Sequence, residues 1–392
     1  MADKTVEKAT SVAPAAEAGA AAQSGARLGS GMADELGQLR EGKKGVSLWQ
    51  DAWKRLKKNK MAMAGMVIVA IYAIISLAAP ILPIYSYRYQ ILEHQYLPPS
   101  LTKTAGELVV EQQIERFLRD NEIYNLDTLT AEQEQEIAAL RERMATEIDE
   151  IDGKEVLMHQ RRYILGTDAL GRDMLARIIY GGQVSILIGL IGTLVSVFLG
   201  TAIGAVSGYV GGRLDSFLMR VVDILYGLPY MLLVIIFMAI LGRSIANLFF
   251  ALAIVSWLTV ARVVRGQIMS LKQSEFVEAA RAAGASPFRV IFRHLVPNTL
   301  GVMVVYTTLR IPSFIMLEAF LSFLGLGVQA PLSSWGSLVG GGVDAMVPYP
   351  WLLFAPAIVM TVFLFSMNFL GDGLRDALDV QSKNKMRGSC ER

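Results

Sequence analysis

The sequence predicts an all-α membrane protein with six transmembrane helices and with both termini in the cytoplasm. Of its 392 residues 53% are hydrophobic, whereas only 18% are charged. A soluble protein carries about 25% charged residues, and a soluble chain this apolar would need several domains to bury its side chains. Charge-free runs of helical length also recur along the chain, as expected where helices cross a bilayer.

The N-terminal part is expected to stay outside the bilayer. Residues 1–45 are rich in Ala, Gly and Ser, lack the apolar core of a signal peptide and predict a disordered cytoplasmic tail. Residues 46–60 interleave Leu and Trp with Lys and Arg, and Ser47 with Gln50 fits a capping box. This pattern favours an amphipathic helix in the cytoplasmic interface. An extension of the first span is the alternative.

The first predicted span covers residues 61–87, and a core of residues 178–375 supplies five more. Four of these five contain charge-free runs, which cover residues 178–212, 224–242, 244–261 and 345–371. The remaining span, residues 299–323, contains Arg310 and Glu318, and a Gly/Pro/Ser-rich loop is expected to follow it. Glycines recur every fourth residue from Gly200 to Gly212, which predicts close packing against another helix.

Basic residues indicate the orientation of these spans. Lys and Arg precede the first span, fill the loop between the fourth and fifth spans and recur in the tail of residues 376–392. The positive-inside rule places all three regions in the cytoplasm. The loop of residues 325–350 has no Lys or Arg and is expected on the opposite side.

Residues 88–177 are predicted to be an extracytoplasmic segment with an acidic helical insertion. From Ser100 to Gln160 there are 15 acidic and 6 basic residues. Thr130 and Gln133 fit a capping box and predict a helix through about residue 148. The insertion is interpreted either as a lid or docking surface for an external partner, or as a solvated segment without chemistry.

The loop of residues 275–298, EFVEAARAAGASPFRVIFRHLVPN, predicts two short helices joined by a tight corner. Gly284 can adopt the left-handed conformation that ends the first helix. Ser286 is a suitable N-cap and Pro287 a suitable first residue for the second helix, which Pro297 is expected to end. One apolar face of the second helix is predicted from the spacing of Phe288, Ile291, Phe292 and Leu295. The small side chains of the first helix favour a docking site over a plain connecting hairpin.

Four separated segments resemble the permeases of ABC importers, in particular the second permease of the dipeptide/oligopeptide/nickel subfamily. One is the loop just described, which is similar to the EAA loop of that family. The other three read LGTDALGRDMLARIIYGGQVSI from Leu165, LEAFLSFLGLGVQAPLSSWGSLV from Leu317 and NFLGDGLRDALD from Asn368. The resemblance implies the ABC-importer permease fold in a bacterial inner membrane.

The resemblance also implies partners and site residues. The partners are a second homologous permease in a heterodimer, cytoplasmic ABC ATPase subunits, an extracytoplasmic substrate-binding protein and the lipid bilayer. Transport of di- or oligopeptides is expected, and a nickel or other small-solute importer is the alternative. The residues that match the motif for coupling to the ATPase are Glu278, Ala279, Ala280, Gly284, Ser286 and Pro287. The residues that match a motif at the outer gate are Asp168, Gly171, Arg172 and Asp173.

Other activities find little support in the sequence. The chain has no G-x-x-x-x-G-K-[ST] motif, so ATP is expected to be used by partner subunits and no cofactor by this chain. Its three histidines are far apart in sequence and its single cysteine lies in the tail, which predicts neither a metal site nor a catalytic site. A net charge of +2 does not favour binding of nucleic acid.

Arg310 and Glu318 are the candidate pathway residues, because charges inside a membrane usually face a cavity or another helix. Structural pairing with another span is the alternative. An ion-coupled secondary transporter that uses both residues is the rival function, although no inverted repeat is visible in the sequence.

Overall fold

The computed structural model describes residues 48–120, 130–151 and 154–378. The chain divides into two compact units, residues 1–54 and residues 55–392. The predicted tail of residues 1–45 and the capping residue Ser47 lie outside the described residues. Helix α2 (Leu48–Leu56) begins in the first unit, where Trp49 and Trp53 are exposed.

Five described helices of the second unit are long and apolar enough to cross a membrane. They are α3 (Lys60–Ala78), α6 (Met174–Val210), α9 (Ile245–Leu271), the helix of residues 287–323 that ends in α12 (Val296–Phe323), and α14 (Trp351–Leu378). Residues 376–378 of the predicted C-terminal tail belong to α14, and the rest of that tail lies outside the described residues.

The sixth candidate span is a broken helix and differs from the straight span predicted at residues 224–242. It consists of α7 (Gly212–Gly227) and α8 (Tyr230–Leu241), which meet at an angle of 85°. Pro229 has no N–H to donate and disfavours a helical conformation at the residue before it. Leu228 accordingly adopts an extended conformation. The chain therefore has five helices of spanning length among its described residues, or six spans if this bent pair counts as one.

The first predicted span is longer than the helix that forms there. Helix α3 begins after Asn59, whose side chain accepts a hydrogen bond from the backbone N–H of Ala62 at 3.2 Å. It ends at Ala78, just before Pro80 and Pro83. A turn after Leu56 separates α2 from α3, so the two are distinct helices rather than one continuous span. The interfacial location of α2 stays a prediction.

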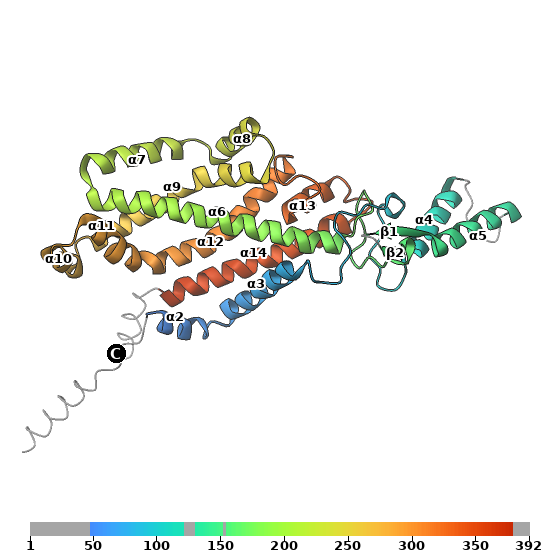
Figure 1. Cartoon of the computed structure of the whole chain (residues 1–392), viewed down its shortest axis with the longest axis horizontal. Helices are drawn as coiled ribbons and strands as arrows, with labels where there is room; N and C mark the ends of the chain where they lie inside the picture. The colour runs from blue at the N-terminus through green and yellow to red at the C-terminus, as the bar shows by residue number, and fades with distance from the viewer. Residues whose placement is uncertain (1–47, 121–129, 152–153, 379–392) are drawn as a thin grey trace, which may run out of the picture. The chain divides into compact units, whose positions relative to one another are not determined.

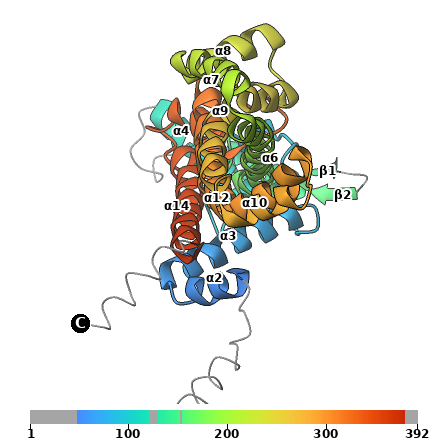
Figure 2. The ribbon, with the colours of Figure 1, turned by 90° about the vertical axis from the view of Figure 1, so that its left-hand side faces the viewer.

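Helices α6 and α9 pack against each other more extensively than any other pair of described helices (Figure 1). Gly200, Gly204 and Gly208 of α6 all face α9, where a Cβ atom on any of them would collide with α9 atoms. The predicted role of the repeated glycines in helix packing is confirmed for these three. Figure 2, turned by 90°, also shows α3 beside α14, and these two helices are in contact.

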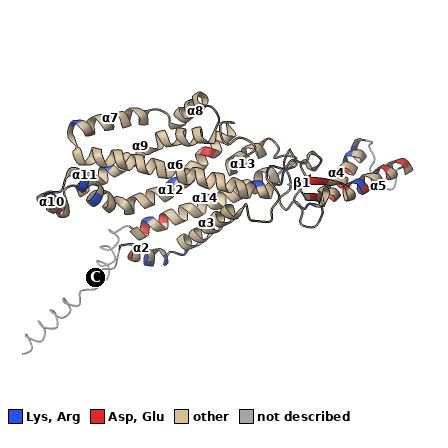
Figure 3. Ribbon diagram, viewed as in Figure 1, with Lys and Arg blue, Asp and Glu red and all other residues tan. Residues whose placement is uncertain are grey.

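The segment between α3 and α6 contains helices α4 (Ala105–Asp120) and α5 (Ala131–Thr146) and strands β1 (Ile148–Ile151) and β2 (Lys154–Leu157). The capping box of Thr130 and Gln133 is confirmed. The antiparallel β1–β2 hairpin is an exception to the predicted all-α fold. The dipeptide Asp152-Gly153 is a common hairpin signal that the prediction missed. Figure 3 shows acidic residues concentrated on α5 and around β1, and few charges along the helices of the bundle.

Candidate functional site

The elbow, residues 275–295, lies at the opposite end of the bundle from α4 and α5 (Figure 1). It consists of α10 (Glu275–Ala282), α11 (Pro287–Arg289) and the π-helical turn η4 (Val290–Leu295). Gly284 has a φ of 80°, which a residue with a side chain rarely adopts. The side chain of Ser286 accepts a hydrogen bond from the N–H of Arg289 at 3.4 Å. Both predicted features of the corner are therefore confirmed.

Pro297 does not end the second helix, as the sequence predicts it should. The helix runs without interruption from Pro287 to Phe323. In the turn just before this proline, the N–H of Val296 donates to the carbonyl of Ile291, five residues earlier. A π-helical turn of this kind widens the helix, which we interpret as the means by which the proline ring is accommodated. The elbow is thereby continuous with a span.

The inner face of the elbow is held by apolar packing. Val277, Val290, Ile291 and Leu295 are buried in one cluster with side chains of α6 and α9. Buried aliphatic side chains of this size stabilise a contact by about 1.5–3 kcal/mol each. The elbow is therefore firmly attached to the bundle.

The outer face of the elbow is exposed and partly apolar. Glu278, Ala279 and Gly284 are exposed, whereas Ala280 is half-buried. Phe288 is 71% exposed, and its ring centroid lies 4.5 Å from that of Phe292. The predicted common face is wrong for these two phenylalanines, because the π-helical turn shifts the helical period between them and the buried Ile291 and Leu295. Sequence periodicity therefore missed Phe288 as a surface residue.

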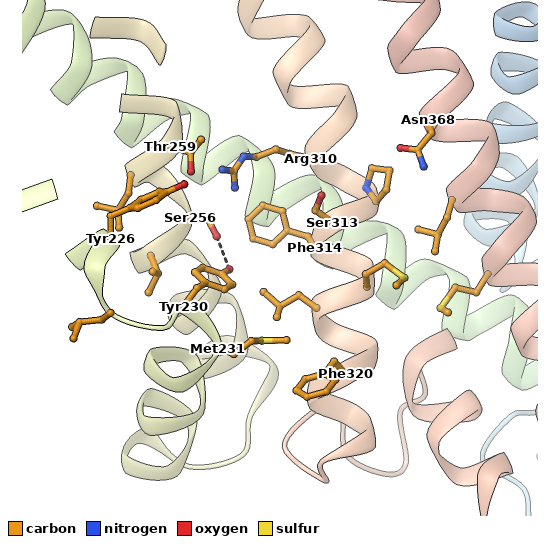
Figure 4. Close-up of a pocket in the computed structure, with 18 of the residues that line it drawn as sticks. Tyr226, Tyr230, Met231, Ser256, Thr259, Arg310, Ser313, Phe314, Phe320 and Asn368 are labelled. Atoms are coloured by element: carbon orange, nitrogen blue, oxygen red, sulfur yellow. Dashed lines mark hydrogen bonds between the residues drawn. The ribbon is translucent and has the colours of Figure 1, made fainter. Parts of the chain in front are cut away.

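A cavity of about 1180 Å³ lies between the bent pair α7–α8 and helices α9, α12 and α14. Its wall is mainly apolar, with polar groups at Tyr230, Ser256, Thr259, Arg310 and Asn368. Figure 4 shows Arg310 pointing from α12 toward Thr259 of α9. The hydroxyl groups of Tyr230 and Ser256 are hydrogen-bonded at 2.8 Å and join α8 to α9.

Arg310 and Glu318 have different surroundings although both belong to α12. Arg310 is half-buried in the cavity wall, and no carboxylate among the described residues forms an ion pair with it. Glu318 is fully buried and is absent from the described lining of the cavity. Its Oε1 accepts hydrogen bonds from the hydroxyls of Ser322 and Ser334, both at 2.6 Å.

Ser334 connects Glu318 to a helix that the sequence analysis missed. Helix α13 (Trp335–Val343) lies within the predicted Gly/Pro/Ser-rich loop, and Ser334 forms a capping box with Ser337 at its start. Trp335 is buried and donates from Nε1 to the carbonyl of Ile178 in α6 at 3.0 Å. Gly336 packs so closely on α12 that a Cβ atom there would collide with Ala319.

The predicted gate motif forms the entry to α6. Asp168 Oδ1 accepts from the N–H groups of Leu170 and Arg172, both at 2.9 Å, and Oδ2 lies 2.8 Å from Nε of Arg172. Gly171 has a φ of 68° and packs against the carbonyl of Ile91. Burial raises the pKa of the Asp173 carboxyl to about 6, although this residue caps α6.

Comparison with known families agrees with this architecture. Residues 200–381 match the family described as binding-protein-dependent transport system inner membrane component. Residues 47–99 match the family described as N-terminal TM domain of oligopeptide transport permease C. The two matches cover the bundle core and the region of α2 and α3, but not the segment with α4, α5 and the hairpin.

Individual relatives are similar over most of the chain. The dipeptide transport system permease protein DppC of Bacillus subtilis is 36% identical over 85% of this chain and 86% of its own length. The oligopeptide transport system permease protein OppC of Escherichia coli K12 is 39% identical over 86% and 93%. OppC of Haemophilus influenzae is 48% identical over 56% and 71%. The chain therefore belongs to the OppC/DppC-like permeases, the multi-pass membrane components of binding-protein-dependent ABC importers.

Proposed function

We propose that this chain carries di- or oligopeptides across a bacterial inner membrane as one half of a heterodimeric pathway. The names of its relatives as dipeptide and oligopeptide permeases support this substrate class. An ABC importer permease requires ATPase subunits and a substrate-binding protein as partners, and we place the ATPases on the elbow. With the elbow in the cytoplasm, the segment with α4 and α5 faces the binding protein and both termini are cytoplasmic.

The proposal that the ATPases bind the elbow rests on one observation: the elbow has a packed inner face and an exposed outer face. Its inner face is packed into α6 and α9, whereas Glu278, Ala279 and Phe288 are exposed on the other side. An exposed phenylalanine beside small side chains is suited to insertion into a groove on a partner. Because the elbow continues directly into α12, a push on it reaches the span that carries Arg310. The angle between α10 and α11 is set by the corner residues Gly284, Ser286 and Pro287.

The cavity supports a peptide rather than a metal ion as substrate. Its polar groups offer donors and acceptors for peptide bonds, and Arg310 offers a cation for a terminal carboxylate. The same positive charge would repel a free nickel ion, and the described lining contains no His, Cys, Asp or Glu. We therefore assign Arg310 to the pathway. We assign Glu318 to the attachment of α13, because its carboxylate binds Ser334. The gate motif positions α6 beside α13 at the outer end.

The coupling proposal is tested by co-purification of the permease with its ATPase subunits. Glu278→Arg and Phe288→Ala are expected to lose the ATPase while inserting normally, because both side chains are exposed. Glu115→Arg is the matched control for charge, and Leu101→Ala is the matched control for apolar area, since Leu101 is 72% exposed in the distant segment. Retention of the ATPase by both elbow variants would show that coupling occurs elsewhere.

A further inference from the structure

A cluster of metal-ligating side chains lies in the segment between α3 and α6, remote from the elbow and from the cavity. Its members are Glu93 of η1 (Leu92–His94), Glu147 at the end of α5 and His159 of η3 (Met158–Gln160). One ligand atom from each of the three lies within 4.8 Å of the others. We propose that these three side chains bind a Zn²⁺ ion that fastens η1 to α5 and the hairpin.

The distances in the cluster are close to those of a tetrahedral zinc site. Nε2 of His159 lies 3.2 Å from Oε2 of Glu147 and 3.4 Å from Oε2 of Glu93. Bonds of about 2.0–2.2 Å from zinc to nitrogen and oxygen place neighbouring tetrahedral ligands about 3.3–3.6 Å apart. Both carboxylates are more than a third exposed and can rotate to bring their oxygens together. We assign the fourth position to water, because both carboxylates are solvent-exposed.

The imidazole of His159 is already oriented for this task. Its Nδ1 lies 2.8 Å from Nε2 of His94, and Nδ1 of His94 lies 2.9 Å from the hydroxyl of Tyr163. All three side chains are buried. If each histidine donates from Nδ1, the lone pair on His159 Nε2 is directed at the two carboxylates. Hydrogen bonding of the second ring nitrogen is the usual way in which a protein orients a metal-bound histidine.

The backbone also holds the ligands in register. Ile148 of β1 pairs with Leu157 of β2, and the N–H of Met158 donates to the carbonyl of Glu147 at 3.1 Å. His159 follows directly and therefore stands beside Glu147 at the base of the hairpin. A mixed set of one imidazole and two carboxylates suits Zn²⁺ better than Mg²⁺ or Ca²⁺, which prefer oxygen ligands alone.

Arg143 is the charged group that competes with a metal ion here. Its guanidinium lies 2.5 Å from Oε1 of Glu93 and 3.4 Å from Oε2 of Glu147. One cation between two carboxylates leaves a net negative charge beside the imidazole of His159. Since the Arg143 side chain is 53% exposed, it can move outward when an ion enters. Substitution of Arg143 therefore distinguishes a metal site from a simple cluster of ion pairs.

The sequence predicts no metal site, because the three histidines are far apart along the chain. The fold brings His94 and His159 into direct contact across 65 positions. The ligands come from three elements without a short spacing motif, so no local pattern could have indicated them.

The test is zinc binding to the full-length chain, purified without a histidine tag in detergent and stripped with EDTA. Zn²⁺ is titrated in competition with a chromophoric chelator, and bound metal is counted by elemental analysis. We expect about one Zn²⁺ per chain in the native protein, and its loss in His159→Gln and Glu147→Gln. Glu150→Gln, which removes an exposed carboxylate of β1, is the matched control and should bind as the native chain does.

Two further measurements guard against a variant that fails to fold. Because the Glu147 carboxylate is exposed, Glu147→Gln should keep the native melting temperature without metal, while losing the increase that Zn²⁺ gives the native chain. Arg143→Gln should bind Zn²⁺ at least as tightly as the native chain, since it removes a competing cation. Absence of Zn²⁺ from the native chain, equal binding by Glu147→Gln, or weaker binding by Arg143→Gln would each overturn the proposal.

Discussion

Two effects shift the pKa of the Asp173 carboxyl in opposite directions. Its carboxylate oxygens accept hydrogen bonds from the N–H groups of Leu175 and Ala176 at the start of α6, which favours the charged form. The same side chain is only 5% exposed, and burial disfavours the charged form. Burial prevails, because the pKa is raised from 3.8 to about 6.

This raised pKa predicts a pH-dependent contribution of Asp173 to stability. The contribution is fully present below about pH 4 and is lost as the pH rises through about 6, because the folded chain resists deprotonation. Asp173→Asn keeps an equivalent cap. Relative to this variant, the native chain should therefore lose about 2–3 kcal/mol of stability between pH 4 and pH 7. Thermal unfolding in detergent measures the difference. Asp173→Ala, which removes the cap, should be less stable than Asp173→Asn throughout, and a difference without pH dependence would contradict the prediction.

Arg310 is predicted to recognise the carboxylate of a peptide substrate. Loss of a hydrogen bond to a charged group costs about 1.5–3 kcal/mol, so Arg310→Gln should weaken peptide uptake about 10- to 100-fold. Arg310→Lys retains the charge and should lose less. Amidation of the peptide C-terminus removes the proposed partner and should add little to the effect of Arg310→Gln. Competition between radiolabelled and amidated peptides measures this coupling. Fully additive effects would assign the carboxylate to another residue.

Residue-level roles were only partly predictable from the sequence. The corner residues Gly284 and Ser286 could be identified because local backbone chemistry determines them. The gate motif was implied only by the resemblance to a known family, and its role at a gate stays a prediction. The separation of Arg310 from Glu318 could not, since two residues on one helix give no information about the partners on other helices. The partner of Glu318 outside its own helix is Ser334, in a loop that the sequence leaves without structure.

At the scale of elements, the glycines of α6 have effects that depend on what faces them. Gly204 of α6 lies against the backbone of Ala261 in α9, whereas nothing lies within 4 Å of a Cβ atom on Gly266 of α9. Gly204→Ala should therefore destabilise the bundle by about 1–3 kcal/mol through overpacking. Gly266→Ala should be neutral or stabilise it by about 0.5–1 kcal/mol through helix propensity.

The two variants make the same chemical change in helix interiors, so their comparison isolates packing from propensity. Melting temperatures of the purified variants in one detergent provide the measurement. Equal shifts would mean that α6 and α9 can separate without cost.

Element boundaries followed from sequence where the signal is local and failed where packing decides. Thr130 begins α5 as its capping box predicts. By contrast, Pro297 lies inside a continuous helix because a π-helical turn precedes it, and Pro229 breaks a run that is apolar enough to be one span. Helix α13 forms in a glycine-rich loop because Trp335 is buried against α6, Tyr72 of α3 and Phe363 of α14. Single-sequence patterns do not contain these tertiary contacts.

For the whole molecule, the membrane class could be predicted from composition. The use of separate ATPase subunits was implied by the four segments that resemble ABC-importer permeases. The structure adds a physical link between an ATPase docked on the elbow and the cavity. The elbow and the cavity both belong to the second unit and are joined by one helix, which runs from Pro287 past Arg310 to Phe323. Force applied at one end of this helix can therefore reach the cavity through one continuous helix.

This connection predicts that uptake depends on ATP and not on an ion gradient. Proteoliposomes containing the two permeases and the ATPases, with ATP on the side of the elbow, should accumulate peptide when the binding protein is present on the other side. A hydrolysis-deficient ATPase should abolish accumulation, because no force would reach the elbow. An ionophore that collapses proton and sodium gradients should leave accumulation unchanged. Accumulation that survives the inactive ATPase but fails with the ionophore would instead support the ion-coupled transporter, with Arg310 as its charged group.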